Sequence, residues 1–253
     1  MLGPTIRRPP HVTPPLMPVH HALRVVDLAK RYGELWALRE ASFTLARGEI
    51  VGLIGPNGSG KTTLLETVSG LLPCDRGRLE VEGRPLGIHD RRNVLFYLPD
   101  TVRPWPDQRV DWVLRMIEGL FDCASGSREA VVERLALDGL GSARLHTLSK
   151  GEHRRVMLAI GLMTPQPVLL LDEPFDGLDL RQTREVMAVL RECADRGRTL
   201  LVSIHQLIDA GRVADRLVLL SAGRVVGEGT LGELRDAAHL PEGSVEEVFL
   251  ALT

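Results

Sequence analysis

The chain has 253 residues, enough to bury a substantial core in one or two domains. Its 31 lysines and arginines nearly balance 33 aspartates and glutamates, so the net charge of −2 gives no electrostatic basis for binding nucleic acid or an anionic membrane surface. No apolar run approaches the roughly 20 residues of a membrane-spanning helix. The cysteines lie far apart without a C-x-x-C pair, which favours a reducing compartment over disulfides or a zinc site. They are Cys74, Cys123 and Cys193.

The first 21 residues are rich in proline and lack the apolar segment of a signal peptide. Such proline density predicts an extended tail over residues 1–21, followed by one folded domain over residues 22–253. Alternating apolar residues then predict strands over Ala22–Leu28 and Ala41–Leu45, and a more continuous apolar strand over Glu49–Ile54.

A glycine-rich turn follows the third strand and leads into a helical pattern. It reads Gly55-Pro56-Asn57-Gly58-Ser59-Gly60-Lys61-Thr62-Thr63. This is the G-x-x-x-x-G-K-T sequence of a P-loop in the strand–turn–helix setting that a P-loop requires. Backbone N–H groups and the positive end of the helix would cradle a polyphosphate, Lys61 would reach its outer phosphates, and the Thr62 hydroxyl would bind Mg²⁺. The turn therefore predicts nucleotide binding.

Further strands are predicted over Gly77–Gly83 and Val94–Leu98, and helices over Asp111–Phe121 and Arg128–Leu137. The motif Leu148–Glu152 then precedes an apolar helical run. Its Ser-x-x-Glu spacing is a capping box, and a capped helix N-terminus with a glycine N–H is also a good phosphate-binding surface. The structural and functional interpretations are compatible.

Apolar strands over Val168–Leu171, Thr199–Ile204 and Arg216–Leu220 alternate with helical patterns, which predicts a parallel sheet covered on both faces. The first of these strands ends in Asp172 and Glu173. There Asp172 could hold Mg²⁺ through water, while Glu173 could accept a hydrogen bond from an attacking water. Alone, the pair could equally be two solvated acids before a turn; the P-loop favours the catalytic interpretation.

With these motifs in this order, the chain resembles the nucleotide-binding subunits of ABC transporters over about residues 22–252. Leu148–Glu152 matches the family signature, Asp176–Asp179 the D-loop, and Ser203-Ile204-His205 the switch histidine. The resemblance implies an α/β fold: a P-loop NTPase core with a mostly parallel sheet, an N-terminal antiparallel β subdomain, and a helical subdomain inserted over about residues 101–162. It also implies an ATPase that uses ATP and Mg²⁺.

Residue roles follow from the same resemblance. Two ATPs would lie between two subunits, with Ser149 and Gly151 of one subunit completing the ATP site of the other. The dimer would be a homodimer or a heterodimer with another ATP-binding subunit. His205 would hydrogen-bond the γ-phosphate, and Asp179 would couple the sites at the dimer seam. Tyr32 matches the aromatic residue that stacks on adenine, with a buried strand tyrosine as the alternative.

The sequence departs from the family pattern in the signature, where Lys150 and Glu152 replace a glycine and a glutamine, and at Asp100, where the family has glutamine. Asp100 would join Asp172 and Glu173 in a three-carboxylate Mg²⁺ site, strained by repulsion without the cation. The substitution Asp100→Asn would then raise the stability of the metal-free protein. Alternatively, Asp100 only begins a turn.

The chain resembles the single-cassette subunits of bacterial exporters for drugs, antibiotics, haem or ions. An integral membrane permease is the implied partner, which would place the subunit on the cytoplasmic face of the membrane, and no nucleic acid is expected. The permease would dock beside Arg103, Trp105 and Asp107, although Trp105 could instead pack the helical section. The alternatives are a soluble ABC ATPase acting on ribosomes or DNA, and a regulatory module that holds ATP without turnover.

Overall fold

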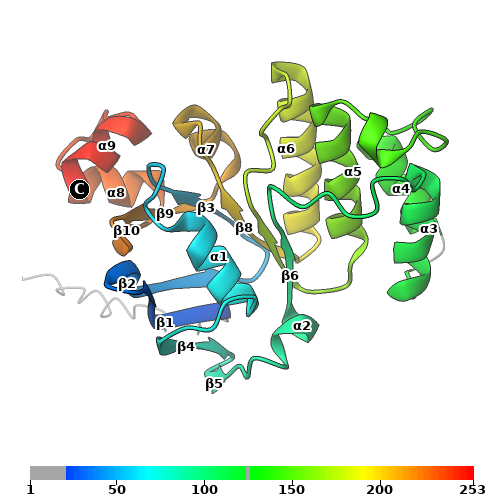
Figure 1. The fold of residues 1–253 in the computed structure, drawn as a ribbon. Helices are drawn as coiled ribbons and strands as arrows, with labels where there is room; N and C mark the ends of the chain where they lie inside the picture. The colour runs from blue at the N-terminus through cyan, green and yellow to red at the C-terminus, as the bar shows by residue number, and fades with distance from the viewer. Residues whose placement is uncertain (1–20, 124–125) are drawn as a thin grey trace, which may run out of the picture.

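The computed structural model describes residues 21–123 and 126–253, so the predicted tail lies outside the described residues except for His21. Two sheets lie against each other, and a group of helices extends to one side of them (Figure 1). The predicted α/β fold with an antiparallel and a mostly parallel sheet is confirmed.

The antiparallel sheet has the strand order β2-β1-β4-β5. Its strands are β1 (His21–Tyr32), β2 (Leu35–Ala46), β4 (Arg76–Val81) and β5 (Arg84–Pro85). The β1–β2 hairpin is longer than predicted. Its register shifts near Asp27 (φ 50°) and Glu40 (φ 58°), which adopt left-handed backbone conformations. These irregularities interrupt the two-residue alternation from which strands are predicted.

The second sheet has the order β10-β9-β3-β8-β7-β6, and all of its pairs are parallel except β9–β10. Its strands are β3 (Ile50–Ile54), β6 (Leu95–Leu98), β7 (Val168–Leu171), β8 (Thr199–Ser203), β9 (Arg216–Ser221) and β10 (Arg224–Gly229). Every residue of β3, β7 and β8 is buried, as expected for a parallel sheet covered on both faces. The edge strand β10 was not predicted.

Alternate residues of the central strands belong to two separate cores. Leu169 and Leu171 of β7 pack with the helices, whereas Val168 and Leu170 pack towards α1 (Lys61–Ser69) and the antiparallel sheet. This arrangement holds the carboxyl ends of the parallel strands, where the predicted motifs lie, between two packed layers.

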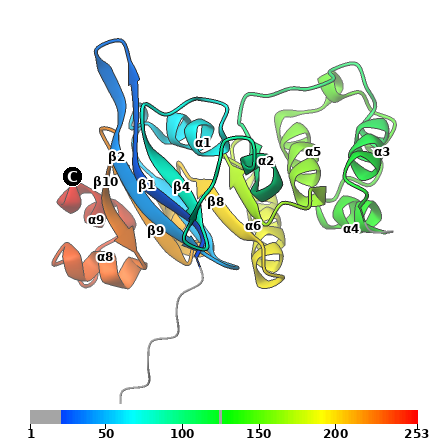
Figure 2. The same cartoon turned by 90° about the horizontal axis from the view of Figure 1, so that it is seen from below.

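The helical section between β6 and β7 comprises α3 (Val110–Leu120), α4 (Ser127–Arg134), the 3₁₀ turn η1 (Leu145–Thr147) and α5 (Lys150–Met163). These helices stand beside the sheets (Figure 2). The helix predicted over Arg128–Leu137 ends earlier, at Arg134, and Ala136 beyond it adopts a left-handed backbone conformation with φ 48°. At the far end of α5, the Arg198 guanidinium donates to the carbonyls of Gly161 and Leu162 and so ties the helix to the start of β8.

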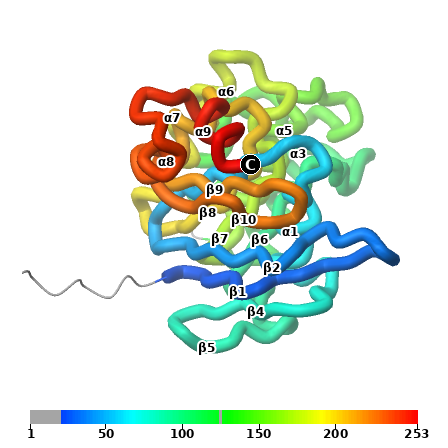
Figure 3. Tube along the Cα trace, turned by 90° about the vertical axis from the view of Figure 1, so that its left-hand side faces the viewer, coloured from blue at the N-terminus to red at the C-terminus, as the bar shows by residue number. Residues whose placement is uncertain are grey.

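The remaining helices are α2 (Arg91–Val94), α6 (Leu180–Asp195), α7 (Leu207–Val213), α8 (Leu231–Ala237) and α9 (Val245–Leu252). The C-terminal helices α8 and α9 pack on each other, α8 against β10 and α9 against α7 (Figure 3). Among the described residues, no helix is long and apolar enough to cross a membrane.

Candidate nucleotide site

The loop between β3 and α1 has the tight shape that its glycines require. Gly60 precedes α1 with φ 105°, and a Cβ there would lie 2.6 Å from the carbonyl oxygen of Ala37. A Cβ on Gly55 would lie 2.2 Å from the carbonyl oxygen of Leu220. Side chains at these two positions would therefore collide with backbone rather than with movable groups.

Polar groups inside this loop suit a phosphate. Lys61 is buried as a residue, and its ammonium donates to the carbonyl oxygens of Gly55 (2.7 Å) and Pro56 (3.2 Å). Burial lowers the pKa of Lys61, while the charges of Glu173 and Asp172 oppose that shift. The buried Ser59 hydroxyl has no hydrogen-bond partner within the described part of the chain, and Ser59 does not line the cavity above the P-loop.

Three hydroxyls converge on the buried Asp172 carboxylate. Ser203 donates to its Oδ1 at 2.6 Å, and Thr62 and Tyr97 donate to its Oδ2 at 3.0 and 3.3 Å. Burial, and then the negative charge of Asp172, raises the pKa of Tyr97, so its hydroxyl remains a proton donor. The Thr62 hydroxyl at the start of α1 and the Asp172 carboxylate after β7 are brought together, and oxygen ligands of this kind suit a hard cation such as Mg²⁺.

Ser203 and Tyr97 were not predicted as site residues. They lie at the carboxyl ends of β8 and β6, the strands that flank β7 in the sheet. Because the carboxyl ends of parallel strands meet at one edge, their hydroxyls could have been assigned to Asp172 from the predicted strands.

Glu173 lies one residue beyond Asp172, in the left-handed backbone region with φ 49°. Its N–H donates to Ser203 Oγ at 2.8 Å, and its Oε1 lies 3.4 Å from Nε2 of His205. Burial is the main cause of a raised Glu173 pKa, and the positive charge available on His205 acts against it. A carboxylate with a raised pKa beside an imidazole is suited to accept a proton or hydrogen bond from water.

A cavity of about 450 Å³ opens above the P-loop. Its lining includes Lys61, Thr62 and Glu173, with Trp36 and Arg39 of β2 on another wall. A smaller cleft of about 210 Å³ lies between the loops after β7 and β8; Glu173 and His205 both line it. Glu173 therefore borders both spaces.

The predicted adenine contact Tyr32 does not line the P-loop cavity, within the residues that the structure describes. Tyr32 ends β1, is about half exposed, and has the Lys30 ammonium 5.5 Å from its ring centroid. Trp36, four residues further along the hairpin, supplies the aromatic side chain that borders the cavity. Sequence reasoning missed Trp36, because the longer β1–β2 hairpin was not predicted.

Comparison with known proteins agrees with this geometry. The sequence profile of the ABC transporter family matches residues 38–176, more than half of the chain. The chain belongs to the ABC transporter family. It is 35% identical over 220 residues to a daunorubicin resistance ATP-binding protein of Streptomyces coeruleorubidus, covering 85% of this chain and 70% of that protein. It is 33% identical over 220 residues to a zinc transport system ATP-binding protein of Treponema pallidum, covering 83% and 82%.

Among solved structures, the ATP-binding subunit of an ABC transporter superposes with a TM-score of 0.83 and 30% sequence identity. The match covers 91% of this chain and 98% of that chain. The protein is therefore an ATP-binding and ATP-hydrolysing subunit of the ABC transporter family.

The residues that match the ABC signature and D-loop form helix caps. Ser149 is the N-cap of α5, with Glu152 N donating to its hydroxyl at 3.3 Å, and Asp179 is the N-cap of α6, accepting from Gln182 N at 2.8 Å. Gly151 packs so closely on the D-loop that a Cβ would lie 3.0 Å from the carbonyl oxygen of Gly177. In the described part of the chain, Ser149, Gly151 and Asp179 lie outside the cavity above the P-loop.

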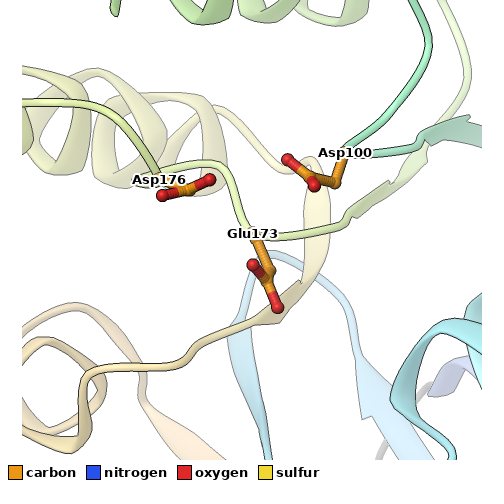
Figure 4. Close-up of side chains that lie close together, drawn as sticks. All are labelled: Asp100, Glu173 and Asp176. Carbon is orange, nitrogen blue, oxygen red and sulfur yellow. The ribbon is translucent and has the colours of Figure 1, made fainter. Parts of the chain in front are cut away.

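The three-carboxylate cluster differs from the predicted one. Oxygens of Asp100, Glu173 and Asp176 lie within 4.8 Å of one another, so Asp176 takes the place expected for Asp172 (Figure 4). Asp100 is also ion-paired with Arg154, a buried side chain of α5. A positive charge thus pairs directly with the Asp100 carboxylate, although the negative charge of Asp100 still helps to raise the pKa of Glu173; the expected repulsion is opposed by Arg154 and stays a prediction.

Proposed function

We propose that this ATPase subunit dimerises around two ATP molecules and drives a separate integral membrane permease, in an export system for a drug, antibiotic, haem or ion. The observation that carries the proposal is the convergence of Lys61, Thr62 and Glu173 on the cavity above the P-loop. The Thr62 hydroxyl there donates to the Asp172 carboxylate at the end of β7. The relatives named for daunorubicin resistance and zinc transport support a drug or an ion among these substrate classes.

Each side chain has a distinct role in the proposed site. The P-loop N–H groups and Lys61 bind the β- and γ-phosphates of ATP, and Thr62 and Asp172 hold Mg²⁺, which neutralises phosphate charge. Ser203 and Tyr97 fix the Asp172 carboxylate, and Ser203 also fixes the backbone of Glu173. Glu173 then orients the attacking water.

His205 is the second group beside that water in the proposed mechanism. Its ring lies close enough to Glu173 to share the hydrogen-bonding of the water and the γ-phosphate. Adenine stacking is assigned to an aromatic residue of the β1–β2 hairpin, either Tyr32 at the end of β1 or Trp36, which lines the cavity.

The partner subunit completes each site in the proposed dimer. Ser149 is exposed at the N-terminus of α5 and lies outside its own subunit's P-loop cavity, as a residue that binds the partner's ATP must. Gly151 lies in the same turn of α5, buried against the D-loop at Gly177, and the exposed Asp179 of that loop lies at the proposed seam. The exposed side chains of Arg103, Trp105 and Asp107 are the proposed permease contact, on the cytoplasmic face of the membrane.

The substitution Glu173→Gln tests the catalytic assignment. It keeps the side-chain shape but removes the basic oxygen, so we expect unchanged ATP affinity, hydrolysis reduced at least about hundredfold, and an ATP-bound dimer on gel filtration. Glu66→Gln is the matched control, because Glu66 also has a pKa raised by burial and by Asp172 but does not line the cavity. Unchanged turnover in Glu173→Gln, or equal losses in both variants, would refute the role of Glu173.

The transport assignment needs a separate experiment. Affinity purification from detergent-solubilised membranes should recover a permease at a fixed stoichiometry, and membrane vesicles holding the complex should move substrate in the export direction only with ATP. Recovery with ribosomes or DNA instead, with no membrane subunit, would favour a soluble ABC ATPase.

A further inference from the structure

The first two turns of α5 are joined to the nucleotide core by two ion pairs. Arg154 pairs with Asp100 in the loop after β6, and Lys150 pairs with Asp176 in the loop after β7 at 2.5 Å. Asp100 and Lys150 are two of the positions at which the sequence departs from the family pattern. Both departures thus have an oppositely charged partner within the same subunit.

These pairs act on the carboxylate cluster beside the catalytic centre. Asp100, Glu173 and Asp176 come from two loops and converge within 4.8 Å (Figure 4). Three negative charges at that spacing repel one another, but Arg154 and Lys150 each bring a positive charge to one of them. Glu173 is the member of the cluster without an arginine or lysine partner in the described part of the chain.

Arg154 is the more constrained of the two cations. Its side chain is only 6% exposed, and Asp100 is its only ion-pair or hydrogen-bond partner among the described residues. The Lys150 and Asp176 side chains are both much more exposed, so water screens their pair. A buried guanidinium cannot turn to solvent when its partner is removed, so each member of the Asp100–Arg154 pair depends on the other.

We propose that Arg154 is a positioning residue for ATP hydrolysis, which acts through Asp100 to hold the carboxylate cluster around Glu173 and to tie the signature end of α5 to that centre. The inference rests on the ATPase activity of the chain, not on the transported substrate. Without Arg154, the Asp100 charge faces Glu173 unpaired, and the loop after β6 loses its attachment to α5. Lys150 supports the same arrangement weakly, through Asp176.

A double-mutant cycle tests the coupling between the two residues. We expect Arg154→Gln and Asp100→Asn each to lower kcat about tenfold while changing KM for ATP less than about threefold, because the P-loop contacts are untouched. The double variant replaces the ion pair with two amides and leaves no unpaired charge, so its kcat should return to within about threefold of wild type. Arg154→Lys, which keeps the charge, should retain more activity than Arg154→Gln and covers the case in which the latter does not fold.

Arg155→Gln is the matched control. Arg155 is the next residue of α5, and among the residues that the structure describes its guanidinium donates only to the carbonyl oxygens of Leu135 and Ala136, both at 2.9 Å. We expect a loss of stability without a change in kcat per folded molecule, with the folded fraction measured by urea unfolding.

Three results would overturn the inference: losses that simply multiply in the double variant, equal kcat losses in Arg155→Gln and Arg154→Gln, or single variants that lose stability with an unchanged kcat. A wild-type chain without ATP turnover would instead refute the ATPase assignment, and this inference with it.

Discussion

Ser203 offers the sharpest test of how the strand ends build the site. Its buried hydroxyl donates to Asp172 at 2.6 Å and accepts from the N–H of Glu173 at 2.8 Å. One side chain thus holds both the proposed metal ligand and the backbone of the water-orienting residue. The substitution Ser203→Ala removes both contacts and adds no bulk.

The expected energy follows from those two hydrogen bonds. A hydrogen bond to a charged group contributes about 1.5–3 kcal/mol, and a buried N–H left without a partner costs about 1–3 kcal/mol. Thr62 and Tyr97 still donate to Asp172 in the variant, so we take a value in the lower half of the summed contributions, about 3 kcal/mol. For a chain of this size that loss corresponds to a fall in Tm of roughly 6–12 °C.

Urea unfolding and steady-state ATPase measurements on the same preparations check this prediction. The control is Thr199→Val, at the other end of β8, where a buried hydroxyl also makes two contacts, with Ala46 O and Gly48 N at 3.0 Å each. It should lose about 1–2 kcal/mol of stability with kcat unchanged, because its partners are uncharged and lie at the end of β8 opposite the proposed catalytic site. Ser203→Ala should lower kcat about tenfold, since the catalytic groups lose their alignment. Unchanged stability in Ser203→Ala, or equal kcat losses in both variants, would refute the reasoning.

Two further predictions concern the dimer seam and pH. Ser149→Arg and Ser244→Arg remove the same kind of capping box, from α5 and α9 respectively, and each should lower the free energy of unfolding by about 1 kcal/mol. Only Ser149→Arg should abolish ATP-driven dimerisation on gel filtration, while its monomer still binds ATP. Dimerisation of both variants would contradict the proposed role of Ser149. Burial raises the pKa of Glu173 in the folded state above the value of about 4.5 that the side chain has in the unfolded chain. The ionised carboxylate therefore destabilises the metal-free subunit increasingly as the pH rises above about 4.5. In urea titrations with EDTA, Glu173→Gln should therefore gain stability over wild type between pH 4 and 8, with no gain at the acid end; a constant difference would exclude this linkage.

Local patterns predicted most of the fold, because each depends on residues close together in the sequence. The P-loop needs its glycines where a Cβ would meet backbone, and the capping box at Ser149 needs Glu152 three residues later. The continuous burial of β3, β7 and β8 likewise appears in the sequence as apolar runs. The predicted β1 and β2 were too short because bulges break the alternation on which the prediction depends.

Contacts between distant elements could not be predicted in the same way. Asp100 and Arg154 are 54 residues apart, and their pairing depends on how α5 lies against the loop after β6. From the sequence, Asp100 is one more acid beside Asp172 and Glu173, so its removal should relieve repulsion. From the structure we expect the opposite sign: removal of Asp100 leaves a buried guanidinium unpaired, and this penalty should exceed the relief of repulsion, because Arg154 already pairs with the carboxylate. The same substitution is thus expected to destabilise the nucleotide-free subunit, and the difference arises entirely from a partner that only the tertiary arrangement brings to the site.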